Sequence, residues 1–235
     1  MKVRIKFQKI GPVKFVGHLD TMRYFQKALR RAGLPVAFSG GYSPHMIMSF
    51  AIPLGVGTET KGDYFDLELT ETRATSYIKD ALESQMAEGF QIVSVRQVED
   101  GKTSSAMSLV AAADYEIQFR PGKEPAFPWQ EHLASFLGRS EIPVNKKTKR
   151  GEKEVDIRPY IYDMHTEKGG LFMKLASASA NYTKPELVLD TFFKSLNLEI
   201  LPFSYCITRL ELYALKGKDE SEGFITLEGL GEEIE

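Results

Sequence analysis

The spacing of apolar residues switches from a period of two to a helical period and back, and the switches come in the same order twice along the chain. Residues 3–9 alternate between apolar and mostly basic side chains, which predicts a half-buried strand with a basic outer face. Residues 18–32 then place apolar side chains on one helical face, and Gly33 ends the pattern. The other elements predicted in this half are strands at 36–38, 46–52, 63–69 and 91–98 and a helix between Thr72 and Gly89.

The second half repeats this order with an elaborated hairpin. Its predicted strands lie at 114–119, 142–147, 155–162, 170–177 and 204–215, and its predicted helices at 128–137 and 183–196. We therefore expect an α+β protein made of two tandem ferredoxin-like (βαββαβ) domains. The expected domains are 1–100 and 113–216, with a linker at 101–112 and an acidic tail at 217–235 that frays.

The cysteine content and the hydropathy limit the class of protein. Cys206 is the single cysteine, which excludes a disulfide framework, a zinc ribbon and a cysteine-ligated cluster within this chain and fits a reducing compartment. The chain has no run of 18 apolar residues, and no apolar segment follows its basic first residues. We expect a cytoplasmic protein.

The charge is unevenly distributed along the chain. Residues 1–50 contain nine Lys and Arg against Asp20 alone, whereas residues 51–100 contain four basic and ten acidic side chains. This segregation favours a basic face that meets a polyanion, although a dipolar surface without a partner remains the alternative.

The predicted first helix carries the densest group of candidate binding residues. A helix start at His18, beside Lys14, would accept a phosphate at its backbone N–H groups, and His18 could also donate a proton. Simple capping is the alternative for this segment. Further along the helix, a stripe of cations is expected to contact phosphates or to face solvent: Arg23, Lys27, Arg30 and Arg31.

Two further segments are candidates for nucleic-acid contact. In the first, Gly40 and Gly41 permit a close backbone approach and Tyr42 could stack on a base, or the segment is a plain loop. It matches neither the phosphate-binding nor the dinucleotide-binding glycine motif. The second is a basic hairpin in the second half, whose cations would grip a backbone or protect a sheet edge: Lys146, Lys147, Lys149, Arg150 and Arg158.

Candidates for catalysis are few. His18 and His45 flank the basic segment and could act as general acid or base, but no Ser-His-Asp or Cys-His arrangement can be defended. His18, Asp20 and His45 match no defined metal-ligand spacing, so we expect no metal.

The segment from Phe7, FxKxGPVKFVGHLDTMRYFQKALRRAGLPVAFSGGYSPHMIMSFAIPLGVGTET, together with Asp156-Ile157-Arg158-Pro159, resembles the radical-SAM-linked protein family. The resemblance covers roughly residues 2–215 and implies a cytoplasmic bacterial protein encoded beside, or fused to, a radical SAM protein. It carries over no catalytic residue. The chain has no CxxxCxxC motif, so an iron–sulfur cluster, S-adenosylmethionine and cobalamin would belong to the partner, with no cofactor here.

The element order is also similar to tandem ferredoxin-like RNA-processing proteins of the CRISPR repeat-cleaving kind, a likeness of fold alone. The favoured function is an RNA-binding accessory module, for tRNA or rRNA, that acts with a radical SAM RNA- or protein-modifying partner. One alternative is a metal-independent RNA endonuclease that uses His18 and His45. The other is a protein–protein adaptor that binds no nucleic acid.

Overall fold

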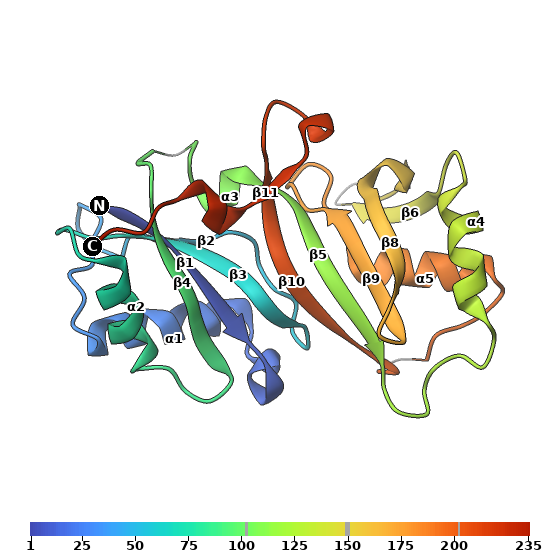
Figure 1. The fold of residues 1–235 in the computed structure, drawn as a ribbon, viewed down its shortest axis with the longest axis horizontal. Coiled ribbons are helices and arrows are strands. Elements are labelled where there is room, and N and C mark those ends of the chain that lie inside the picture. The colour runs from blue at the N-terminus through green and yellow to red at the C-terminus, as the bar shows by residue number, and fades with distance from the viewer. Residues whose placement is uncertain (102, 149–150, 202) are drawn as a thin grey trace. The chain divides into compact units, whose positions relative to one another are not determined.

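The computed structural model describes residues 1–101, 103–148, 151–201 and 203–235, and the chain divides into two compact units. Unit 1 contains Met1–Ala111 and Arg209–Glu235, and unit 2 contains Ala112–Thr208. The protein has a mixed α and β fold in which strands are extensive and helices are few (Figure 1). The expectation of an α+β protein is confirmed at this level.

Unit 1 is built on the strand order β4-β1-β3-β10, with β2 paired to β3 and β11 paired to β10. Its elements are β1 (Lys2–Lys9), a 3-10 helix (Gly11–Phe15), α1 (His18–Arg31), β2 (Met48–Phe50), β3 (Glu59–Glu68), α2 (Thr75–Glu83), β4 (Phe90–Val98), α3 (Ala106–Leu109), most of β10 (Tyr205–Leu215), a 3-10 helix (Glu220–Glu222), β11 (Phe224–Thr226) and a last 3-10 helix (Leu227–Leu230). β1 is antiparallel to both β3 and β4.

One face of this sheet is apolar and packs against the two longer helices of unit 1. Val3, Ile5 and Phe7 alternate along β1 and are fully buried, as their period of two predicts. From α1, Phe25 inserts among the aromatic side chains of the strands, with its ring centroid 4.8 Å from that of Phe7. Burying a large apolar side chain of this kind contributes about 1.5–3 kcal/mol, so this face holds α1 in place.

β3 begins earlier than the sequence pattern indicates. Residues 55–62 look like a flexible turn, yet the strand starts at Glu59 and includes Gly62. A Cβ atom at Gly62 would lie 2.4 Å from the carbonyl oxygen of Leu210 in β10. The glycine is therefore needed for the close approach of two strand backbones.

The other face of the unit 1 sheet is charged, and its charges are buried. Lys2, Arg4 and Lys6 alternate with the apolar residues of β1, but only 6%, 1% and 9% of their surfaces are exposed. Arg4 contacts both carboxylate oxygens of Asp66 on β3, at 2.8 and 3.1 Å. The prediction of a basic outer face is wrong for β1, because these cations are neutralised inside unit 1.

Lys6 lies between two carboxylates that come from the C-terminal residues of the chain. Its Nζ atom is 2.6 Å from Glu211 and 2.6 Å from Glu228. The Tyr64 hydroxyl donates to Glu211, and the Ser94 hydroxyl donates to Glu228. Each member of this network therefore has a partner of opposite charge or a hydrogen bond, as a buried ionic group requires.

The acidic tail is ordered, so the prediction that it frays is wrong. Leu227 is fully buried, and its carbonyl oxygen accepts a hydrogen bond from Arg4. Glu232 pairs with Gln97 of β4, and the carbonyl oxygen of Ile234 accepts from Thr75. The last residues thus run along unit 1, with both chain termini on the same side (Figure 1).

Unit 2 has the strand order β10-β5-β9-β8, with β6 and β7 in a separate two-stranded sheet. Its elements are β5 (Val110–Phe119), a 3-10 helix (Trp129–His132), α4 (Leu133–Leu137), β6 (Pro143–Thr148), β7 (Gly151–Asp156), a 3-10 helix (Arg158–Tyr160), β8 (Ile161–Glu167), β9 (Gly170–Ala176), α5 (Pro185–Ser195) and the start of β10. The strand predicted at 155–162 is wrong in extent, because the 3-10 helix around Pro159 divides it into the end of β7 and the start of β8.

Removal of Arg4 is expected to destabilise the protein because it leaves Asp66 buried without its main counter-charge. We predict that Arg4→Met lowers the free energy of unfolding by about 3–5 kcal/mol. The matched control is Arg23→Met, because Arg23 is exposed and pairs with the exposed Asp20, and its loss should stay below about 1 kcal/mol. Urea denaturation of both variants measures the difference, and equal losses would contradict a structural role for Arg4.

The Glu228 carboxylate makes the free energy of unfolding depend on pH in the acidic range. Burial alone raises the pKa of Glu228, but the hydrogen bonds from Lys6 and Ser94 and the charge of Lys6 outweigh burial, so the pKa lies below its usual value. A lowered folded-state pKa gives stability above the unfolded pKa of about 4.3, and this stability is lost as the pH falls through the folded-state pKa.

Glu228→Gln should therefore cost about 1–3 kcal/mol at pH 7 and much less near pH 3. Glu235→Gln removes the same charge from an exposed position of the same tail and serves as the control. Urea denaturation across the pH range provides the measurement. A cost of Glu228→Gln that stays constant with pH would show that its ion pair does not contribute.

Candidate functional site

The Gly-Gly-Tyr segment is the exposed tip of a small hairpin in unit 1. The hairpin is held by the bridge between Phe38 and Met46 and by two contacts of the Ser39 hydroxyl with His45. The hydroxyl oxygen accepts from the His45 backbone N–H at 3.1 Å and shares a hydrogen bond of 2.8 Å with His45 Nδ1. Within the tip, Gly41 has a φ of +96° and Tyr42 is fully exposed.

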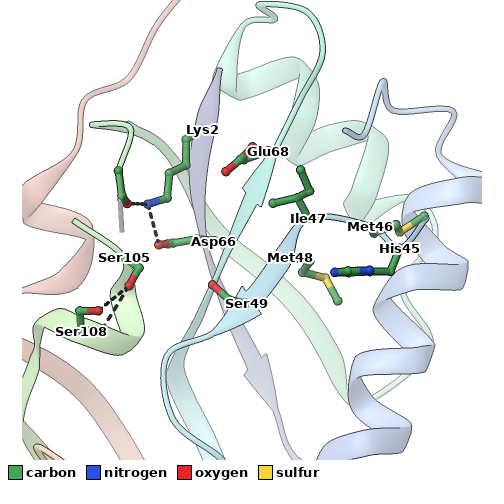
Figure 2. A pocket seen from close by; sticks show the side chains of 11 residues that line it. Lys2, His45, Met46, Ile47, Met48, Ser49, Asp66, Glu68, Ser105 and Ser108 are labelled. Carbon is green, nitrogen blue, oxygen red and sulfur yellow. Dashed lines mark hydrogen bonds and ion pairs between the residues drawn. The ribbon is translucent and has the colours of Figure 1, made fainter. Parts of the chain in front are cut away.

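A pocket of about 490 Å³ lies beside the base of this hairpin (Figure 2). One wall comes from the segment that leads into β2, with Ile47 and the imidazole of His45; Met46 and Met48 also line it, but their side chains pack against the apolar core. The remaining lining comes from β1, β2, β3 and the segment around α3: Lys2, Ser49, Asp66, Glu68, Gly101, Ser105 and Ser108. The volume falls within the range of small-molecule sites.

Two of the charged side chains in this pocket, Lys2 and Asp66, are already engaged in ion pairs and hydrogen bonds. Lys2 Nζ lies 3.6 Å from Asp66 and donates to the carbonyl oxygen of Gly101 at 3.1 Å. Asp66 also accepts from Arg4 and from the backbone N–H of Ala106. Glu68 differs, because no hydrogen bond or ion pair of its side chain is recorded within the described residues. The pocket therefore offers one half-buried carboxylate as an acceptor.

The cations of α1 are exposed, in contrast to those of β1. Arg23, Lys27, Arg30 and Arg31 all lie on the solvent side of the helix. Arg23 pairs with Asp20 at 3.0 Å, and Arg31 donates to Gln85. This stripe is available for contact with phosphates. Lys14 is less available, because it pairs with Glu59 at 3.0 Å.

His18 is the first residue of α1 and lies away from the larger pocket. Its ring packs edge-on against Phe50, with centroids 5.3 Å apart. It lines a second pocket, of only about 10 Å³, with buried Lys9 and Asp63. Burial lowers the pKa of Lys9, and its Nζ donates to the carbonyl oxygen of Val16. The predicted pair of histidines is thus divided between two pockets, because His45 lines the first.

Two of the predicted nucleic-acid-binding residues of unit 2, Arg158 and Lys146, already make hydrogen bonds within the fold. Arg158 donates from Nε to the carbonyl oxygen of Leu137 at 2.7 Å and from Nη1 to that of Ile161 at 3.2 Å. Lys146 donates to the carbonyl oxygen of Tyr182 at 3.2 Å, and burial lowers its pKa. The backbone of Lys147 lies in β6, and the predictions for Lys149 and Arg150 fall outside the described residues.

Sequence reasoning did not identify most of the residues that line the larger pocket. Of the predicted site residues, His45 alone is in its lining, whereas Glu68, Ser105 and Ser108 were not candidates. A usable signal was the alternation of β3, which puts Asp66 and Glu68 on the face opposite its apolar residues.

Within residues 1–101, 103–148, 151–201 and 203–235, no group of three or more His, Cys, Asp and Glu side chains is placed to hold a metal ion. In the same part of the chain, no helix has the length and apolar character needed to cross a membrane.

A family model described as "Uncharacterized protein conserved in bacteria (DUF2344)" matches residues 2–185, well over half of the chain. No curated protein matches the chain significantly.

The backbone of the hairpin tip allows a matched test of its geometry. A side chain at Gly41 would be forced into the left-handed region, so Gly41→Ala should lower the free energy of unfolding by about 1–2 kcal/mol. Gly40 has open space around it and an ordinary φ, so Gly40→Ala should be close to neutral. Urea denaturation compares the two variants, and a neutral Gly41→Ala would contradict this tip conformation.

Proposed function

Because the chain belongs to the conserved bacterial family DUF2344, we propose a function for it from its own site: it is an RNA-binding accessory module. The RNA is a tRNA or an rRNA, and the module presents it to a radical SAM partner that modifies RNA or protein. The single observation that carries the proposal is the exposed cationic stripe on α1.

The contrast between the two sets of cations supports this reading. Within the described part of the chain, Lys27 and Arg30 are exposed and have no recorded ion pair. Cations that stabilise the fold are buried against carboxylates, as Arg4 is against Asp66. Exposed, unpaired cations at helical spacing can neutralise phosphates at little desolvation cost, and released counterions then favour binding.

The hairpin tip supports RNA over other polyanions. Tyr42 presents its whole ring to solvent, and an unstacked base can lie on such a ring. Stacking on one aromatic side chain contributes about 1–3 kcal/mol per base. A polyanion without bases would gain nothing from this residue.

The proposal includes a more specific fold than the mixed α and β class. We infer that each unit is ferredoxin-like. Strand order β4-β1-β3 with β2 on the far side of β3, and β10-β5-β9-β8 in unit 2, support this inference. Ferredoxin-like sheets are common scaffolds for RNA binding, although fold alone does not give function.

The radical SAM partner is proposed from the sequence resemblance. Since Cys206 is the only cysteine, the iron–sulfur cluster, S-adenosylmethionine and any cobalamin would be bound by that partner. The two alternatives find less support. His18 and His45 line different pockets, which does not favour a shared cleavage site. An adaptor could present the acidic residues of 51–100 or the acidic tail, of which Glu228 is engaged with Lys6 inside unit 1.

RNA binding is tested by filter binding of a single-stranded RNA over a salt series. The wild-type protein should show a linear fall of log affinity with log salt. Lys27→Ala/Arg30→Ala removes two unpaired cations and should reduce the slope by about 1.4, since each phosphate contact on a single strand contributes about 0.7. Alanine preserves the helix.

The matched control is Lys123→Ala/Lys194→Ala, which removes two exposed cations from unit 2. It should leave the slope nearly unchanged. Absence of RNA binding at low salt, or equal effects of the two double variants, would reject the proposed role of α1.

A further inference from the structure

The larger pocket is unsuited to a phosphate. The cation that lines it among the described residues, Lys2, already lies 3.6 Å from Asp66 and donates to the carbonyl oxygen of Gly101. Arg4 and Lys2 share the charge of Asp66, and Glu68 adds a second carboxylate to the lining. An anionic ligand group would therefore find no unengaged cation among the described residues of the pocket, and a neutral or cationic group is the better match.

The shape of the lining points to a flat ligand with an apolar surface and polar edges. Ile47 points toward Glu68 and gives an apolar surface, and the planar ring of His45 also lines the pocket (Figure 2). Opposite them lie the hydroxyls of Ser105 and Ser108, 2.8 Å from each other. A nucleobase combines these properties, because it stacks on apolar and aromatic groups and hydrogen-bonds at its edge.

Glu68 decides which base fits. Its carboxylate is half-buried, lines the pocket and has no recorded side-chain partner in the described residues. A carboxylate accepts hydrogen bonds only, so it selects an edge that donates. The exocyclic amino group of cytosine donates to a carboxylate, whereas uracil carries a carbonyl oxygen at the same position.

We propose that this pocket binds one unpaired, amino-bearing nucleobase of a single-stranded RNA, with the amino group donating to Glu68. The proposal rests on RNA binding by this protein and deepens it by naming the feature that is read. The phosphates of the same strand stay outside the pocket, and Tyr42, three residues before His45 at the exposed tip, is placed to stack on a neighbouring base.

The test compares two probes that differ at one ring substituent. Equal-length oligoribonucleotides of cytidine and of uridine are titrated into the full chain and followed by fluorescence anisotropy at fixed salt. The wild-type protein should bind the cytidine oligomer about tenfold more tightly, which is within the discrimination that one base-edge contact supplies. Glu68→Gln should reduce this preference to about twofold or less, because the carboxamide can also donate to uracil.

Glu88→Gln is the matched control, since Glu88 is exposed and does not line the pocket. It should keep the full preference for cytidine. The urea midpoint of Glu68→Gln should equal that of the wild type, which separates a loss of base selectivity from a loss of stability.

Three results would overturn the inference. Equal wild-type affinities for the two oligomers, or an unchanged preference in Glu68→Gln, would refute the base pocket while leaving RNA binding intact. A protein that binds neither oligomer at low salt would refute the proposed function and the base pocket together.

Discussion

The ion pair between Arg4 and Asp66 is the interaction on which the organisation of unit 1 depends. Two oppositely charged side chains from neighbouring strands meet with both surfaces almost wholly buried. Such a pair is tolerable only when its remaining donors and acceptors also find partners. Arg4 therefore draws in the carbonyl oxygens of Ser104 and Leu227, and Asp66 draws in the backbone N–H of Ala106. The segment before α3 and the C-terminal residues are fixed on this face of the sheet as a result.

This arrangement separates the cations of the chain into two groups with different roles. Those of β1 are buried and stabilise the fold: Lys2, Arg4 and Lys6 pair with carboxylates, and Lys9 donates to the carbonyl oxygen of Val16. Those of α1 face solvent on the helix side opposite its buried residues, where Phe25 and Leu29 meet the core. Part of the uneven charge along the sequence is therefore neutralised inside unit 1. The surface that remains basic is smaller than the sequence indicates, and the proposed function depends on it.

The features that sequence predicted are those with local causes. The alternation of Val3, Ile5 and Phe7 and the helical period that includes Phe25 are set by residues close in sequence, and the structure confirms both elements. The burial of Lys6 has a distant cause, because Glu211 and Glu228 lie more than 200 residues away. The pocket is equally non-local, since Glu68 comes from β3 and Ser105 from the start of α3. The periodicity of a sequence does not predict contacts between residues that are far apart in the chain. The opposite charges of β1 and β3 can nevertheless be seen in the sequence.

The return of the chain to unit 1 affects how the protein folds. Residues 209–235 supply most of β10, the strand beside β3, and the Leu227 contact of Arg4. They leave the ribosome only after the whole of unit 2 has been made. Until then Arg4 and Lys6 lack several of their partners, and the backbone of β3 is unpaired along part of its length. Pairings this distant in sequence form slowly and expose strand edges in the meantime. The nascent chain therefore passes through a stage in which its first-made unit is incomplete, and in which assistance from a chaperone would matter most.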